Sequence, residues 1–394
     1  MVEAMAQPPL KKSRTKSRSA TAGARPGAKK EPTTEEIATI RNVCTRFLAG
    51  DGKRDATSLL ASIPLDTQID RYGTGGVVTE IESEMAALLG KDAALFLVTG
   101  IMAQQATLRI HCDDRNRHGV VFHPTCHLDT HEERAYERLH GLSGILCGPS
   151  SKPLTLENLT KVAEPFGALL LELPQRSLGG TLPTWEELVS MTKWARERGG
   201  AVHMDGARLW EAGPFYATTA NKSLADIAAL FDTVYVSFYK GLGAIAGCCV
   251  AGDQRVINEL NVWRTRHGGQ VFGLWPYAAS AKAMFALRSE RFAGYFVRAQ
   301  KIAQALRRVE GVEVLPYPVQ SSMMHLRVSG PRQKVMDRML DIARHDGVWM
   351  FAGPYVTEGP NLQRFEFNVG DATMAFSVEE IRELFERVLG HSKN

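Results

Sequence analysis

A single lysine, Lys240, lies between an apolar run of strand composition and a glycine-rich turn in the stretch VSFYKGLGAIAGCCVAG. Lysine is almost never fully buried unless it is paired or has reacted, so this position calls for a chemical explanation. In the stretch GGAVHMDGARLWEAG, Asp205 and Arg208 follow another apolar run, and Asp205 precedes Lys240 by 35 residues. Because ligands of open α/β sheets bind beyond the carboxyl ends of the strands, these three side chains are candidates for one site.

The stretch LFLVTGIMAQQ adds a candidate anion site, since a strand ends at Thr99–Gly100 and a helix begins there with free backbone N–H groups. A lysine amine, an acid and an anion cradle together meet the needs of pyridoxal 5′-phosphate: a Schiff base, a partner for the pyridinium nitrogen and a phosphate site. Ser237, three residues before Lys240, could add a hydroxyl to the phosphate. The alternative is that Lys240 only forms a salt bridge and Asp205 only caps a helix.

Three histidines, His123, His127 and His131, follow a strand in VVFHPTCHLDTHEE. No set of carboxylates or cysteines completes a zinc pattern around them, so we expect no metal. One of the three could act as a general base on a substrate, and a hydrogen-bonded surface histidine is the alternative for each.

The elements that must position these side chains alternate along the chain. Short apolar strands such as DAALFLV, GVVF, ALLLEL and TVYVSF alternate with helical patterns such as TWEELVSMTKWARER. This alternation is typical of parallel βαβ units, so we expect an α/β fold with a mostly parallel sheet. After about residue 286, long helices and short strands such as SMMHLRV and RFEFNV predict a smaller α+β C-terminal domain.

The predicted organisation has four parts. Residues 1–32 are a basic tail too poor in apolar residues to fold, and 33–65 form an N-terminal helical segment. Within that segment a capping box predicts a helix that ends at Gly50. Residues 66–285 form the large domain and 286–394 the small one.

Charge and composition limit the class of protein. The first 31 residues hold eight Lys or Arg and two Glu, a balance of +6, so the other residues carry about −2 of the net +4. The tail is expected to be solvated, although a targeting peptide or a nucleic-acid arm is an alternative. No apolar run spans a bilayer and the six cysteines have no paired spacing. We expect a cytoplasmic protein with reduced thiols that binds neither a membrane nor nucleic acid.

The motifs RYGTGGVVTEIESEMAALLGKDAALFLVTGIMAQQ, HMDGARLWEAG and SFYKGLGAIAGCCVAG resemble the threonine aldolase and β-eliminating lyase family, a branch of the aspartate-aminotransferase-like (fold type I) superfamily. The resemblance runs from about residue 66 to the C-terminus. It implies that Lys240 holds pyridoxal 5′-phosphate, Asp205 pairs with its ring nitrogen and His127 stacks on its ring. It also implies that the Gly100–Ile101 backbone cradles the phosphate and that Arg208 contacts the substrate carboxylate.

The same resemblance implies a second carboxylate-binding arginine, Arg364, within QRFEFNVGDA. On an alternating strand, an arginine can instead be an exposed cross-strand partner. Since the sites of this family lie at subunit interfaces, the resemblance also implies a homodimer or homotetramer that acts on a small amino acid.

Several departures from the family pattern place the exact substrate in doubt. The N-terminal serine element has no match, and the phosphate turn lacks the usual threonine. The stretch LELPQRSLGG puts Gln175, Arg176 and Ser177 near the cofactor, and Gln270 and Val271 stand where a phosphate-binding arginine is frequent. These differences indicate a divergent subgroup.

The expected reaction is cleavage of the Cα–Cβ bond of a β-hydroxy-α-amino acid to glycine and an aldehyde. β-Elimination or another carbanion reaction on the same scaffold is the alternative, because the orientation of the substrate decides which bond breaks. A non-catalytic binding protein is a remote third alternative.

Overall fold

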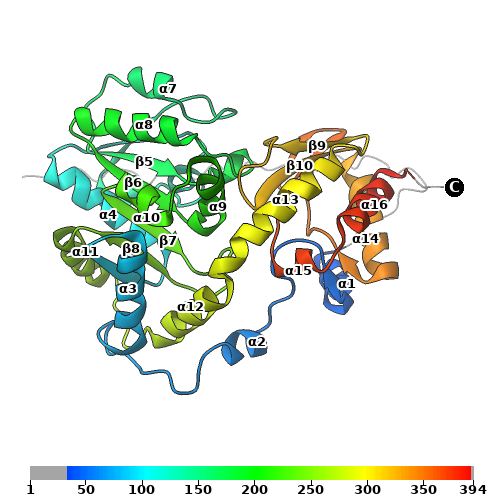
Figure 1. Cartoon of the computed structure of the whole chain (residues 1–394), viewed down its shortest axis with the longest axis horizontal. Helices are drawn as coiled ribbons and strands as arrows, with labels where there is room; N and C mark the ends of the chain where they lie inside the picture. Colours follow the sequence, from blue (N-terminus) through cyan, green and yellow to red (C-terminus); the bar gives the residue numbers. More distant parts are fainter. Residues whose placement is uncertain (1–32, 392–394) are drawn as a thin grey trace, which may run out of the picture.

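The computed structural model describes residues 33–391, so the predicted basic tail at 1–32 lies outside the described residues. The described chain folds into a large unit around one sheet and a smaller unit beside it (Figure 1). Its cysteines are buried and unpaired. Among residues 33–391, no helix combines the length and the apolar character that crossing a membrane requires.

The large sheet has seven strands in the order β2-β8-β7-β6-β5-β3-β4. Their bounds are β2 (Ala93–Leu97), β3 (Gly119–Phe122), β4 (Ser143–Leu146), β5 (Ala168–Glu172), β6 (Ala201–Gly206), β7 (Thr233–Ser237) and β8 (Cys248–Gly252). Only β8 runs against its two neighbours, β2 and β7. The predicted α/β fold with a mostly parallel sheet is therefore confirmed, and the other six strands end at one edge.

Helices cover both faces of this sheet because successive side chains of each strand point to opposite faces. Leu169 and Leu171 of β5 pack into one buried cluster, whereas Leu170 packs into another. The first face is covered by α3 (Gly76–Leu89), α7 (Leu156–Thr160), α8 (Trp185–Glu197), α9 (Leu209–Ala220), α10 (Leu224–Ala229) and α12 (Trp275–Arg288). The second is covered by α4 (Gly100–Asp114), α6 (Ala135–His140) and α11 (Gln254–Arg266).

The smaller unit contains an antiparallel sheet of four strands in the order β12-β13-β10-β9. Its elements are α13 (Phe292–Leu306), β9 (Val312–Leu315), β10 (Met323–Ser329), α14 (Arg332–Asp346), β12 (Val356–Gly359), β13 (Leu362–Asn368), α15 (Asp371–Met374) and α16 (Val378–Leu389). The predicted smaller C-terminal α+β unit is confirmed. Helix α13 leads from the large unit into this sheet (Figure 1).

The N-terminal segment differs from the prediction in one respect. The capping box is present, but helix α1 (Thr34–Val43) ends well before Gly50. The strand β1 (Arg46–Phe47) follows instead and pairs in parallel with β11 (Val348–Trp349). The helix prediction was wrong at this end because Phe47 packs against Leu340 and Trp349, a tertiary contact that the local pattern does not reveal. A short helix, α2 (Ala56–Ala61), comes next.

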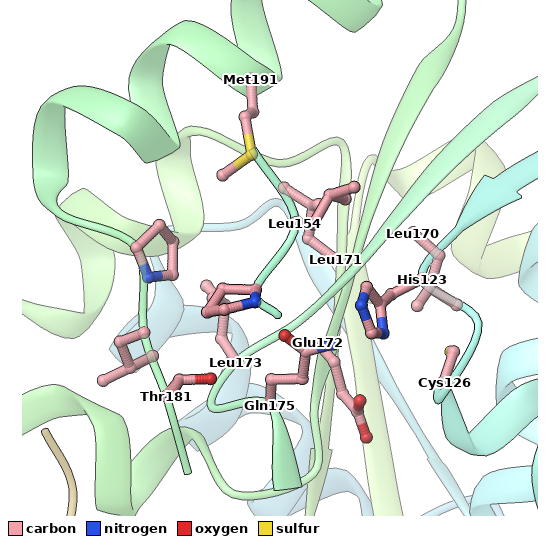
Figure 2. Close-up of a pocket in the computed structure, with 13 residues that line it drawn as sticks. His123, Cys126, Leu154, Leu170, Leu171, Glu172, Leu173, Gln175, Thr181 and Met191 are labelled. Atoms are coloured by element: carbon pink, nitrogen blue, oxygen red, sulfur yellow. The ribbon is translucent and has the colours of Figure 1, made fainter. Parts of the chain in front are cut away.

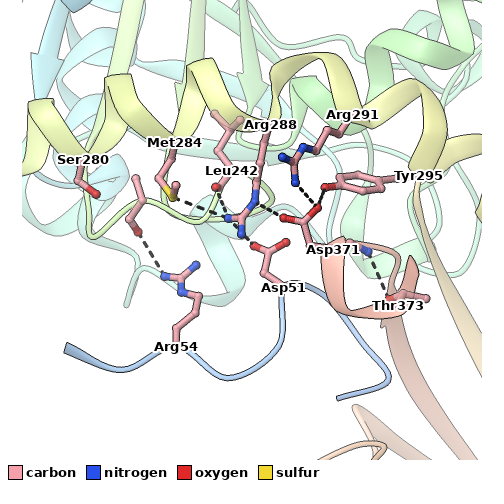
Figure 3. A network of polar contacts seen from close by, with 12 residues as sticks. Asp51, Arg54, Leu242, Ser280, Met284, Arg288, Arg291, Tyr295, Asp371 and Thr373 are labelled. Atoms are coloured by element: carbon pink, nitrogen blue, oxygen red, sulfur yellow. Dashed lines mark hydrogen bonds and ion pairs between the residues drawn. The ribbon is translucent and has the colours of Figure 1, made fainter. Parts of the chain in front are cut away.

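A polar network fixes the N-terminal segment between the two units (Figure 3). The Arg288 guanidinium at the end of α12 donates to the Leu242 carbonyl at 2.7 Å and lies 3.2 Å from Asp51. It also lies 2.9 Å from Asp371 of α15, which contacts the Tyr295 hydroxyl. The segment that carries Asp51 is therefore held against the turn that follows Lys240.

Candidate active site

A cavity of about 500 Å³ opens at the carboxyl edge of the large sheet. Its walls include Gly100, Ile101, His127, Asp205 and Lys240, together with Tyr235 and Tyr239. We call this space the α4 cavity. The structure thus brings five of the predicted site residues together from three strand ends and one helix N-terminus.

Lys240 lies in the turn between β7 and β8 and is partly buried. Burial, followed by the nearby charge of Arg208, lowers the pKa of its amine, while Asp205 and Glu172 oppose this shift. Within residues 33–391 the amine has no hydrogen bond and no ion pair. A lysine with a lowered pKa and a free amine is suited to attack a carbonyl group.

The N-terminus of α4 forms one wall of the α4 cavity. Thr99 caps the helix by accepting a hydrogen bond from the Met102 amide. The amides of Gly100 and Ile101 have no backbone acceptor in the described part of the chain, and they carry the positive end of a long helix dipole. A side chain at Gly100 is excluded, because its Cβ would lie 2.1 Å from the Tyr235 hydroxyl.

Two carboxylates lie on neighbouring strands at the end of the sheet. Asp205 is 3% exposed and accepts a hydrogen bond from the Ala207 amide at 3.0 Å. Glu172 is its register partner on β5, and burial, followed by the Asp205 charge, raises the pKa of Glu172 to about 8. Glu172 also lines a small apolar pocket under β5 (Figure 2), and its Oε2 has no hydrogen-bond partner there among described residues. Burial beside Asp205 therefore favours the protonated form of Glu172.

The three histidines have different surroundings. His127 lines the α4 cavity, and its Nδ1 is 2.9 Å from Oε1 of the buried Glu132. His131 lines the same cavity and stacks on His127 with ring centroids 5.0 Å apart. His123 instead lines the small pocket of Figure 2, and its Nε2 donates to the carbonyls of Pro149 and Lys152. His123 is thus a structural histidine.

A second cavity of about 380 Å³ lies on the other side of Lys240. It is bounded by Arg208 and Glu211, by Asn368 of β13 and by residues 50–54 of the N-terminal segment. We call it the N-terminal cavity. Burial raises the pKa of Glu211 to about 7. Arg208 has no hydrogen-bonded side-chain acceptor among the described residues, so its guanidinium is available to a carboxylate.

Arg364 is not a wall of either cavity. Its Nε lies 3.3 Å from Glu358, and its guanidinium lies over the Tyr355 ring. Arg176 lies over the same ring and donates to Glu366 at 2.6 Å. Arg364 is therefore connected to the cavities only through its neighbours Glu358, Tyr355, Arg176 and Glu366.

The remaining predicted residues do not line the α4 cavity. Ser237 is fully buried, and the residues from its segment that line the α4 cavity are Tyr235, Tyr239 and Lys240. Ser177 donates to the Thr125 carbonyl. Gln175 lines the small pocket beside Glu172, whereas Gln270 bonds to Thr265 and to the Tyr72 carbonyl. Four residues that depart from the family pattern are Gln175, Arg176, Ser177 and Gln270. Of these, only Arg176 contacts a charged group of the site, Glu366.

Sequence reasoning missed Glu172, Glu211 and Glu366. Glu172 ends a strand inside the quoted stretch LELPQRSLGG, so the strand-end rule would have found it. Glu211 lies on α9 and Glu366 on a strand of the other unit, and the sequence around them carries no comparable signal.

The α4 cavity fits pyridoxal 5′-phosphate. A free lysine amine, a buried carboxylate and two helix N-terminal amides without acceptors are the donor set that the group requires. Within the described chain, no cluster of three His, Cys, Asp or Glu side chains is arranged to hold a metal.

Residues 56–329 match the beta-eliminating lyase family. The chain belongs to this family. Its members, which include threonine aldolases, depend on pyridoxal 5′-phosphate, and the chain is accordingly a pyridoxal-phosphate-dependent lyase.

Individual relatives agree on the family and differ in reaction. A crystal structure of a putative L-allo-threonine aldolase from Listeria monocytogenes has a TM-score of 0.84 and 34% identity, covering 90% of this chain and 98% of that one. The Penicillium aethiopicum aldolase vrtJ is 29% identical over 69% of this chain and 71% of its own length. The Cochliobolus carbonum alanine racemase TOXG is 30% identical over 51% of this chain and 53% of its own.

Proposed function

We propose that this chain binds pyridoxal 5′-phosphate in the α4 cavity and cleaves the Cα–Cβ bond of a β-hydroxy-α-amino acid to give glycine and an aldehyde. The observation that carries the proposal is the position of Lys240 between two cavities. One cavity has the acid, the histidine and the helix N-terminus, and the other has the available Arg208.

The cofactor, when bound, withdraws electrons from the bond to the α-carbon that breaks. In this proposal Lys240 holds it covalently, and Asp205 keeps a proton at its ring nitrogen. The amides of Gly100 and Ile101 hold its phosphate, with Ser237 as a further hydroxyl nearby.

The other residues act on the amino acid. Arg208 holds the α-carboxylate, with Arg364 as the second arginine on the facing strand, and this orients the Cα–Cβ bond. The Nδ1 of His127 faces Glu132, so its Nε2 is free to take the proton of the β-hydroxyl. His131, which lines the same cavity beside His127, is the alternative base.

Amino acid racemisation is a second candidate. It needs groups that move a proton at each side of the α-carbon, and the Tyr239 hydroxyl lines the α4 cavity with Lys240. The similarity to TOXG supports the same candidate.

We also propose that the chain is a homodimer or homotetramer. Leu65, Ile69, Tyr72 and Phe272 expose more than half of their surface. The rings of Tyr72 and Phe272 touch at 5.3 Å between centroids. A contiguous exposed apolar patch is typical of an interface, and light scattering at several protein concentrations tests for it; a monomer with full activity contradicts the proposal.

The test of function is aldehyde release from L-threonine and L-allo-threonine, coupled to an alcohol dehydrogenase, with 2-oxobutanoate followed in the same samples. Aldehyde without the oxo acid is expected. Oxo acid without aldehyde indicates β-elimination, and D-alanine from L-alanine without either product indicates racemisation.

A further inference from the structure

Glu366 places a carboxylate among the arginines of the site. The alternation of β13 puts Arg364, Glu366 and Asn368 on one face of the small sheet, and Asn368 lines the N-terminal cavity together with Lys240. The Glu366 side chain is 15% exposed. It accepts from Arg176 at 2.6 Å and from the Asn368 amide at 3.1 Å. The second unit of the fold therefore contributes a fixed acidic group to this side of the site.

Glu366 is charged at neutral pH. Its burial raises its pKa, but the charges of Arg208 and Arg176 outweigh that effect and hold the pKa below its ordinary value. Its other oxygen, Oε1, lies 3.9 Å from Arg208. Any anion that binds to Arg208 must therefore share the space with this carboxylate.

The three arginines of the cluster are not equally available. Arg176 is bound to Glu366, and Arg364 lies 3.3 Å from Glu358. Arg208 has only the 3.9 Å contact, and neither Arg208 nor Arg364 forms a hydrogen bond to a side-chain acceptor in the described part of the chain. Arg208 and Arg364, the two arginines proposed to hold the α-carboxylate, are therefore both occupied by a single substrate carboxylate.

A second carboxylate on the substrate has no partner of this kind. It would have to displace Glu366 from Arg176, and it would be repelled by the carboxylates that remain. Like charges a few ångströms apart in a partly buried site repel strongly, and such a repulsive group is how many sites reject a wrong ligand.

We propose that Glu366 is a specificity-determining residue that restricts the site to amino acids without a second carboxylate. This inference rests on the proposed function in one respect, namely that the α-carboxylate binds at Arg208.

Binding to the holoenzyme tests the inference without relying on turnover. The change in cofactor absorbance is titrated with L-threonine and with L-threo-3-hydroxyaspartate, and the ratio of the two Kd values is recorded. We expect the wild-type protein to bind threonine at least about tenfold more tightly. In Glu366→Gln, which keeps the side-chain volume, we expect the ratio to fall about tenfold.

Two further variants separate charge from structure. Glu366→Asp keeps the charge and is expected to keep most of the discrimination. Glu313→Gln removes a carboxylate of the same sheet that is 58% exposed and pairs with Arg327, and we expect it to leave the ratio unchanged. Thermal melts establish that each variant is folded.

Other outcomes overturn the inference. A wild-type protein that binds both ligands equally contradicts it. Equal tightening of both ligands in Glu366→Gln also contradicts it, because Glu366 would then only occupy the carboxylate site until substrate arrives. If the Kd ratio behaves as expected while no aldehyde forms from threonine, the proposed reaction fails and the inference stands. If threonine leaves the absorbance of the cofactor unchanged, both fail.

Discussion

The α4 cavity and the N-terminal cavity share Lys240 and differ in how their walls are assembled. The walls of the α4 cavity come from strand ends and one helix start between residues 98 and 246. The N-terminal cavity joins residues 41–54, 208–241 and 322–370, which belong to both units and to the N-terminal segment. The residues proposed to bind the cofactor are thus close together in the chain, whereas the cavity proposed to bind the α-carboxylate joins three segments that are far apart in sequence.

Removing Lys240 affects both cavities at once and has the largest expected effect. Lys240→Ala removes the amine that would bind the cofactor covalently, so the visible absorbance of the bound cofactor disappears and activity falls by at least about a thousandfold. Lys161→Ala, at a lysine that is 66% exposed on the surface, is the control. Unchanged absorbance in Lys240→Ala would remove the lysine from its proposed role.

Removing Arg208 distinguishes the roles of the two cavities, because it is expected to affect the substrate and not the cofactor. In Arg208→Gln we expect kcat/KM to fall about a thousandfold, because a charge-assisted contact to the α-carboxylate is lost. The cofactor absorbance is expected to remain, since Arg208 is not a wall of the α4 cavity. Arg196→Gln, at a half-exposed arginine of α8, is the matched control. Loss of the cofactor with intact affinity for amino acids would reverse the assignment.

The polar network around Arg288, which holds the N-terminal segment, is expected to have the next largest effect. Arg288 is 11% exposed and lies between Asp51 and Asp371, so Arg288→Leu leaves Asp51 without its ion-pair partner, while Asp371 keeps Arg291. We expect the free energy of unfolding to fall by about 3 kcal/mol in urea titrations. Arg344→Leu removes an exposed ion pair of α14 and is expected to change little. A similar loss in both variants would mean that the network has no special role.

The smallest effect is expected from Glu172, on the α4 side. In the cofactor-free protein its pKa is about 8, above the ordinary value of 4.5. The folded state then binds more protons than the unfolded state between these values, so stability falls as the pH rises from about 5 to 8. Glu172→Gln is expected to flatten this dependence and to raise the free energy of unfolding at pH 8 relative to wild type. An unchanged slope of unfolding free energy against pH would contradict the raised pKa.

The comparison of the cavities also explains what could be read from the sequence. Alternating apolar strands and helical patterns predicted the sheet. The residues at the strand ends indicated Lys240, Asp205 and Gly100 as site residues, because parallel strands end at one edge. These positions follow from the hydrophobic periodicity of the sequence and from the residue types that mark the ends of strands.

The remaining features depend on contacts between distant segments. The helix that was expected to reach Gly50 yields to strand β1, whose partner β11 is about 300 residues away. The ion pair of Arg176 with Glu366 spans 190 residues. Neither contact leaves a periodic trace in the sequence, so only the structure could locate the acidic group beside Arg208.

The network around Arg288 also bears on the order in which the molecule is completed. The N-terminal segment is synthesised before the large sheet, whereas its partners in β11 and α15 are synthesised after that sheet. The large sheet can form earlier from neighbouring βαβ units, whose contacts are closer in sequence. The wall of the N-terminal cavity therefore closes only after α15 has been made, later than the strands that carry the α4 cavity.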